Sequence, residues 1–255
     1  LRVEDAPSYA QTELIHTLKR AGLATNLRMS LDAGDALSYT SGQSWLDRSG
    51  NGYDFFRGAT SGAEGSDPTF TGTAGQRTSS TYWSFDGGDY FTYDSANEAW
   101  MHNLHKANAK WTVLFWWYAG STGAKCSLFD TYGPGPIGTA FQFSSSAANK
   151  YEVFIVNTSI VMSNVGPTVP ATTWHMIALS VDAAAGASGG LWMLNDTPTT
   201  FNATYTSPSA SNSSGTLQIG VENGITIIPN GSRMAMVAAW EGRALTQAEL
   251  TVVYR

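Results

Sequence analysis

The sequence predicts an all-β fold, an antiparallel β-sandwich of the jelly-roll type with a short helix at each end. Segments rich in Val, Ile, Thr and aromatic residues alternate with turns rich in Gly, Pro, Asn and Asp, which is the pattern of short strands joined by loops. The chain has 255 residues, 42% of them apolar, so one large β domain with a sizeable core is possible. No repeat of fixed period is visible, which disfavours a propeller or solenoid.

Residues 8–22, "SYAQTELIHTLKRAG", predict one amphipathic helix ahead of the β region. Apolar residues fall at helical spacing, and Ser8 and Gly22 are suitable as its N-cap and C-cap. We therefore expect residues 1–28 to form a helical arm and residues 29–255 to form the β domain.

The central part of the chain predicts a series of strands. They are residues 110–119, 139–145, 151–156, 173–182, 190–195, 215–221 and 233–240. The first of them, "KWTVLFWWYA", is apolar on both faces, although a two-layer sandwich needs only one apolar face per sheet. Its second face is therefore either covered by loops or lines a concave groove.

The end of the chain predicts a short closing helix over residues 247–254. Thr246 and Glu249 have the spacing of a capping box. Three apolar residues would pack this helix on the sandwich: Leu245, Leu250 and Val253.

Composition excludes several classes of partner. Charged residues make up only 13% of the chain, and the net charge is −6, so a basic surface for nucleic acid is not expected. No apolar run approaches the roughly 20 residues of a membrane span. The single cysteine, Cys126, permits no intrachain disulfide and is expected to be a small buried residue. A surface made mostly of Ser, Thr, Asn and Gly suits an extracellular or virion protein that meets neutral sugars.

Four stretches carry a resemblance. In chain order they are "LDAGDALSYTSGQSWLDRSGNGYDF", "WSFDGGDYFTY", "WHMIALSVDAAAG" with "LWMLND", and "MAMVAAWEGRALTQAEL". They resemble the first hairpin, a strand pair, the "WHHVAVTYDG…LYVNG" hairpin and the closing strand and helix of laminin-G-like, concanavalin-A-like jelly rolls. Together they span residues 31–255, and the resemblance implies the same sandwich fold.

The segment "PSYAQTELIHTLKRAGL" looks like the helix that precedes such domains in tailed-phage virion proteins. Ala24 and "NLR" stand where that pattern has Trp and "KLD". The resemblance implies a location on the virion surface, contacts with other virion proteins through the N-terminal arm, and a homo-oligomer.

Jelly rolls of this type include glycosidases, polysaccharide lyases and lectins, so the site residues have to decide between them. A retaining glycosidase needs two carboxylates about 5 Å apart, and the Glu-x-Asp-x-x-Glu run of glucanases with this fold does not occur. Glu152 is the only strong mid-strand carboxylate and has no partner two or four residues away, so we expect it to face solvent. His175 is expected to be structural. The sequence therefore predicts that the chain is not an enzyme.

Sugar binding calls for exposed aromatic rings that stack on pyranose faces. The carbohydrate-binding candidates are Trp83, Trp116, Tyr118 and Tyr132. Core packing is the alternative for each of them.

A calcium ion is the one cofactor that the pattern allows. Asp86 and Asp89 flank the Gly-Gly pair of "TYWSFDGGDYFTYDS" and could bind an ion at the rim, with help from the distant loop "GVENG". The alternative is that both carboxylates cap a tight turn by accepting backbone N–H bonds.

These observations predict a non-catalytic virion module that binds host surface glycans. One alternative is a purely structural capsid or tail decoration protein. The other is a polysaccharide-degrading glycosidase or lyase with an unrecognised site around Glu152.

Overall fold

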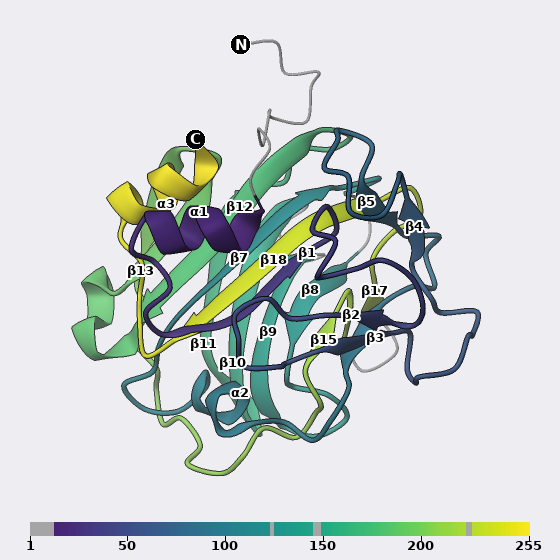
Figure 1. The fold of residues 1–255 in the computed structure, drawn as a ribbon. Coiled ribbons are helices and arrows are strands. Elements are labelled where there is room, and N and C mark those ends of the chain that lie inside the picture. Colours follow the sequence, from purple (N-terminus) through teal and green to yellow (C-terminus); the bar gives the residue numbers. More distant parts are fainter. Residues whose placement is uncertain (1–12, 123–124, 145–148, 223–225) are drawn as a thin grey trace.

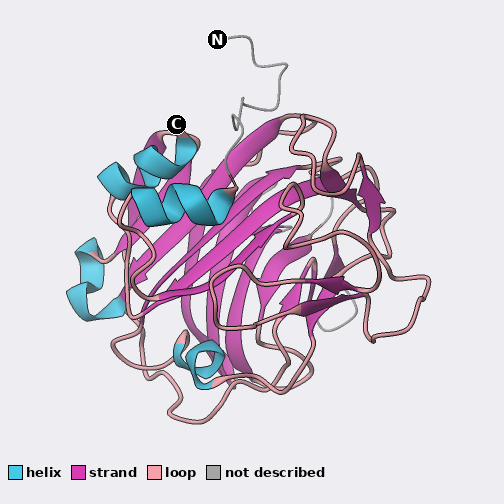
Figure 2. Ribbon diagram, in the orientation of Figure 1, coloured by secondary structure: helices cyan, strands magenta, loops and turns pink. Residues whose placement is uncertain are grey.

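Two antiparallel sheets of eight strands each face one another in the computed structural model (Figures 1 and 2), which describes residues 13–122, 125–144, 149–222 and 226–255. Sheet A has the strand order β14 (Thr197–Phe201), β13 (Gly190–Leu194), β12 (Trp174–Asp182), β7 (Lys110–Tyr118), β18 (Arg233–Glu241), β5 (Tyr82–Ser84) and β4 (Thr69–Thr71), and β1 (Leu27–Asp32) also pairs with β18. The predicted antiparallel β-sandwich is confirmed.

Sheet B forms the second layer. Its order is β11 (Ser159–Thr168), β10 (Lys150–Asn157), β9 (Ile137–Ser144), β8 (Cys126–Asp130), β15 (Gln218–Ile219), β6 (Phe91–Tyr93), β3 (Phe55–Arg57) and β2 (Ser44–Trp45). A separate pair is β16 (Val221–Glu222) and β17 (Thr226–Ile227). The helical elements are α1 (Leu14–Arg20), α2 (Ala99–Asn103), the 3-10 helix η1 (Ala183–Ser188) and α3 (Gln247–Tyr254). Among the described residues, no helix is long and apolar enough to cross a membrane.

The core lies between the two sheets and is rich in aromatic rings. Phe115 and Trp117 on the inner face of β7 are fully buried. Phe115 packs edge-on against Phe141 of β9, with ring centroids 5.7 Å apart, and Trp117 stacks on Phe143 at 5.5 Å. Such large rings supply much of the apolar burial that holds a sandwich together.

The second face of β7 is covered by helices, so neither of the two expected alternatives, a cover of loops or a concave groove, describes it. Leu114 and Trp116 point away from the core and pack with Leu18 of α1 and Leu250 of α3. Figure 1 shows α1 and α3 next to one another over this face of sheet A. The predicted closing helix, with its capping box, is confirmed. Its three packing residues are all buried: Leu245, Leu250 and Val253.

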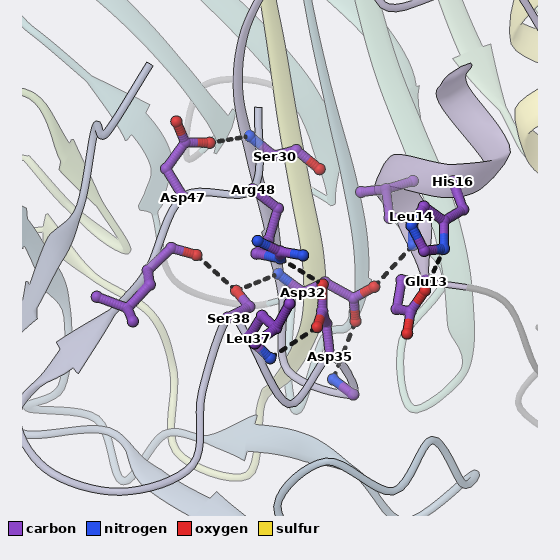
Figure 3. Close-up of polar contacts among 12 residues, drawn as sticks. Glu13, Leu14, His16, Ser30, Asp32, Asp35, Leu37, Ser38, Asp47 and Arg48 are labelled. Atoms are coloured by element: carbon purple, nitrogen blue, oxygen red, sulfur yellow. Dashed lines mark hydrogen bonds and ion pairs between the residues drawn. The ribbon is translucent and has the colours of Figure 1, made fainter. Parts of the chain in front are cut away.

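A polar network fixes the start of α1 to β1 (Figure 3). The carboxylate of Asp32 accepts the backbone N–H groups of Leu14 and Gly34, each at 2.9 Å, and pairs with Arg77. The helix therefore begins at Leu14, and the predicted N-cap Ser8 lies outside the described residues. The boundary expected between residues 28 and 29 falls inside β1.

One predicted strand is divided in the structure, and several observed strands, β11 among them, were not among the predicted ones. The predicted strand 215–221 is divided into β15 and β16, because Gly220 adopts a φ of +95° that a continuous strand does not accommodate. The strand β11 was not predicted, since it contains Gly166 and Pro167. Pro167 is tolerated there because β11 is an edge strand of sheet B.

Candidate functional site

A groove of about 340 Å³ lies on the outer face of sheet B, over β9 and β10. Side chains alternate along a strand between the two faces of its sheet. On β10, Val153 and Ile155 are in the core, so Glu152, Phe154 and Val156 line the groove. The turn between β10 and β11 forms one side of it.

The groove has a polar floor made by neighbouring strands. Gln142 of β9 lies opposite both Glu152 of β10 and Ser127 of β8 in the sheet register. All three side chains are almost fully buried, with exposed fractions of 2%, 3% and 0%. The Oε1 atom of Gln142 has no hydrogen-bond partner among the described residues. A buried polar atom left without a partner costs about 1–3 kcal/mol, so this oxygen is suited to accept a hydrogen bond from a molecule in the groove.

The burial of Glu152 corrects the expectation that it faces solvent. The sequence offered no second carboxylate two or four residues away on the same strand. Its polar neighbour Gln142 comes instead from the adjacent strand, ten positions earlier in the chain. The polar groups of the site are brought together by pairing between adjacent strands, and for this reason the spacing of residues along one strand did not reveal them.

An ion pair forms another wall of the groove. The Lys125 ammonium lies 2.9 Å from the carboxylate of Glu222, which the β16 strand brings from the far end of the sequence. Both side chains line the groove. With Glu152, the lining therefore carries two carboxylates and one ammonium group.

Asp130, at the end of β8, is a buried acid beside this wall. Its Oδ1 accepts the backbone N–H groups of Tyr132 at 2.8 Å and Gly133 at 3.0 Å, while its Oδ2 has no partner within the described part of the chain. Burial raises the pKa of Asp130 to about 7; the negative charge of Glu222 adds to the rise, and hydrogen bonds and Lys125 oppose it. Asp130 thus holds a proton for much of the time near neutral pH.

Tyr132 is the one predicted aromatic residue that lines this groove, where it is half-buried. Trp83 and Trp116 are placed differently, with exposed fractions of 0% and 4%. Trp83 packs in the core against Phe70 and Phe91, and Trp116 lies under the terminal helices. The prediction that these two tryptophans stack on sugars is therefore corrected, because their rings have no free face.

The remaining predicted residues gather around a second hollow, of about 330 Å³, at the β4–β5 end of sheet A. Asp86 and Asp89 line it, and Tyr118 contacts Arg233, which also lines it. The Oδ2 of Asp89 accepts the backbone N–H of Asp86 at 2.7 Å, and the Oδ1 of Asp86 accepts that of Gly88 at 2.8 Å. Both carboxylates thus cap the Gly-Gly turn.

The calcium site stays a prediction. Across the described residues, no group of three or more His, Cys, Asp or Glu side chains is placed to hold a metal ion. Part of the loop that was expected to help, residues 223–225, lies outside the described residues.

Lys125 and Gln142, which line the groove, and Asp130 beside it were not predicted from the sequence, and Glu222 was expected only as part of the "GVENG" loop that was to help bind calcium. The signal for Asp130 and Glu222 was their position at strand ends, next to Gly-rich loops. The signal for Gln142 was its alternation with Phe141 and Phe143, which places it on the outer face.

The comparisons with known proteins rest on structure alone. No protein-family profile and no curated protein matches the sequence. The Trypanosoma rangeli sialidase in complex with sialic acid is 10% identical with a TM-score of 0.57, and the match covers 94% of this chain and 37% of the sialidase chain. The botulinum neurotoxin serotype D binding domain is 10% identical with a TM-score of 0.59, covering 92% of this chain and 51% of that one.

A third similar structure is domain 4 of AbnA, a GH43 extracellular arabinanase from Geobacillus stearothermophilus, in complex with arabinotriose. It is 14% identical with a TM-score of 0.54, and the match covers 90% of this chain and 98% of that domain. At these identities the comparisons show the β-sandwich fold. The chain spans well under half the length of the sialidase that it matches.

These comparisons correct the prediction that the chain is not an enzyme. Sialidases are among the similar structures, alongside a binding domain and an arabinanase domain, so the fold does not separate binding from catalysis. The missing Glu-x-Asp-x-x-Glu run does not separate them either, because the polar groups of the groove come from several strands. The chain has a β-sandwich fold that these sialidase, neurotoxin and arabinanase structures share.

Proposed function

We propose that this chain binds glycans in the groove on the outer face of sheet B, and that its ligand is a neutral oligosaccharide. One observation carries the proposal: a polar floor buried under a groove that Gln142 lines, in which the Gln142 Oε1 atom has no hydrogen-bond partner among the described residues. Sugar hydroxyls are donors of this kind, and sites that bind small molecules combine a few such polar groups with apolar lining.

The lining of the groove suits both the apolar C–H groups and the hydroxyl groups of a sugar. Tyr132 and Phe154 offer aromatic surface to its C–H groups, while Gln142 and Glu152 offer acceptors to its hydroxyls. The one ammonium group of the described lining, that of Lys125, is paired with Glu222, so it is not available to a polyanion. The arabinotriose bound to the similar arabinanase domain is a neutral oligosaccharide and supports this choice of ligand class.

Substitution of the groove floor is expected to weaken binding. Gln142→Leu removes the open acceptor and leaves the sugar hydroxyl unpaired, so we expect the affinity for the best neutral oligosaccharide to fall about 10-fold or more, by about 1.4 kcal/mol. Isothermal titration calorimetry, after a glycan array has identified the ligand, measures this. Gln247→Leu, at an exposed position on α3, is the matched control and should bind normally.

Two results would count against the proposal. One is the absence of binding to every neutral glycan on the array. The other is a Gln142→Leu variant that binds as tightly as the unsubstituted protein, while its thermal unfolding shows that it is folded.

A second candidate function, cleavage of the bound glycan, is favoured by Glu152, whose carboxylate lines the groove. The test is release of reducing ends from a polysaccharide that binds. Glu152→Gln should abolish release and retain binding. If no bound polysaccharide is cleaved, the cleavage candidate is rejected and the binding proposal is unaffected.

The resemblance to phage modules supports a finer proposal, a location on the virion surface with a host polysaccharide as ligand. The expected result is that the purified domain competes with the particle for adsorption to host cells. The structural alternative, a decoration protein that binds other virion proteins, predicts no competition.

A further inference from the structure

The outer face of sheet A has an open part beyond the terminal helices. Trp116 and Met236 lie in the covered part, packed with α1 and α3. Further along the same strands and their neighbours, the rings of Tyr82, Tyr118 and Trp174 remain partly exposed. Their contacts make one cluster, since the Trp174 ring lies 5.7 Å from that of Tyr82 and 6.0 Å from that of Tyr118.

The guanidinium group of Arg233 lies over this aromatic cluster. Its Cζ atom is 5.0 Å from the ring centroid of Tyr82 and 4.7 Å from that of Tyr118, which are cation–π distances. The sheet register explains the placement, because Arg233 lies directly opposite Tyr118 in β7 and Ser84 in β5. Two rings thus hold the planar group in place and leave its N–H edges for other partners.

Arg233 forms no ion pair with a carboxylate anywhere in the described ranges, although the other arginines around the sandwich often do. It lines the hollow of about 330 Å³ at this end of sheet A. The hydroxyl groups of Thr69, Thr71 and Ser84 and the side chain of Asn230 line the same hollow. The two acidic residues there are engaged with the Gly-Gly turn through backbone N–H groups.

We propose that this hollow is a second sugar site, and that it binds a carboxylate-bearing sugar such as a uronic acid. The Arg233 guanidinium would hold the sugar carboxylate through two parallel N–H bonds, the geometry for which arginine is suited. The half-buried ring of Tyr82, which lines the hollow, offers stacking surface for the sugar ring, and the half-buried ring of Trp174 lies next to it. Asn230 and Asp86 would accept hydrogen bonds from its hydroxyl groups.

The chemistry of the hollow separates this ligand from two others. A neutral sugar would leave the guanidinium group without a charged partner, so the groove on sheet B is the better site for it. A metal ion would meet the positive charge of Arg233 beside Asp86 and Asp89, which opposes its binding. The two sites therefore differ in their cation, because Lys125 in the groove is paired with Glu222, whereas Arg233 has no carboxylate partner in the described ranges.

The test uses sugars that differ only in charge. Short oligogalacturonates and their methyl esters, together with glucuronate oligomers and sialyllactose, are titrated into the purified chain. We expect at least one acid sugar to bind, and its neutral methyl ester or its uncharged parent to bind at least 10-fold more weakly. Arg233→Lys should lose a similar factor, because an ammonium group keeps the charge but lacks the planar fork.

Controls separate this site from the groove and from damage to the fold. Arg20→Gln removes an exposed arginine elsewhere and should leave acid-sugar binding unchanged. Gln142→Leu should also leave it unchanged, since it alters only the groove on sheet B. Unchanged thermal unfolding of Arg233→Lys shows that the fold is intact. The proposal is overturned if no acid sugar binds, if acid and ester bind equally, or if Arg233→Lys and Arg233→Gln both bind normally.

Discussion

Asp130→Asn is expected to remove a pH-dependent change of up to ~4 kcal/mol in the free energy of unfolding, which is the largest effect that we predict. Folding raises the pKa of Asp130 from 3.8 to about 7, chiefly because the carboxyl is buried. A group whose pKa is raised in the folded state stabilises the fold fully below its unfolded pKa, and this contribution is lost as the pH rises through the folded pKa. Asparagine fills the same space, can still accept the two turn N–H bonds, and does not titrate.

The measurement is the free energy of unfolding of both proteins between about pH 4 and pH 8. We expect the wild-type protein to lose stability relative to the asparagine variant as the pH rises over this range. The absolute stability of either protein is less informative, because the buried side chain of His175 acts in the opposite direction. Its pKa is lowered to about 4, mainly by burial, so its contribution is lost as the pH falls below 6.5.

The difference between the two proteins removes the shared contribution of His175. A difference that stays constant across the pH range would contradict a raised pKa for Asp130. A wild-type protein that gains stability relative to the asparagine variant as the pH rises would contradict the direction of the predicted pKa shift. Asp196→Asn makes the same change at an exposed position in the turn between β13 and β14 and is the matched control.

Tyr151→Phe is expected to lower the free energy of unfolding by about 3 kcal/mol, because it leaves two buried polar groups without partners. The Tyr151 hydroxyl accepts the indole N–H of Trp117 at 2.8 Å and bonds to Nε2 of His175. The other ring nitrogen of His175, Nδ1, lies 2.8 Å from the carbonyl oxygen of Thr173. The chain of bonds is consistent with a neutral His175 that donates from Nδ1 and accepts at Nε2.

Chemical denaturation measures this loss at a fixed pH. Tyr90→Phe, at a half-buried position in the turn before β6, is the matched control and should change stability by less than about 0.5 kcal/mol. If both variants are equally stable, the buried series of hydrogen bonds from Trp117 to Thr173 contributes no more to the free energy of unfolding than a single half-buried hydroxyl does.

Local patterns were enough to predict the β-sandwich and its closing helix. Thr246 and Glu249 fix the start of α3 through contacts three residues apart, and such contacts are visible in a sequence. The alternation of β7 was also visible, and the structure explains its apolar second face by α1, whose Leu18 is buried there. Interrupted strands were harder to predict from the sequence. Whether Gly220 ends a strand, and whether a strand can contain Pro167, depends on how the neighbouring strands pair, which the sequence does not show.

The candidate sites could be predicted only in part, because they are assembled across strands. Tyr132 and Tyr118 were identified from residue type, and each lies at or beside one of the two hollows. Trp83 has the same residue-type signal and is buried, since aromatic character does not tell a core ring from a surface one. The pairing of Lys125 with Glu222 joins residues 97 positions apart, and no local pattern contains it.

The position of β18 has a consequence for how the chain folds. It is the last strand in the sequence, yet it lies in the middle of sheet A, between β7 and β5, and also pairs with the first strand, β1. The indole N–H of Trp240 in β18 reaches the carbonyl of Leu23, 217 positions away. Contacts this distant slow folding. During synthesis, one edge of β7 stays unpaired until β18 has left the ribosome. In that interval the unpaired edge can form hydrogen bonds with a strand of another chain.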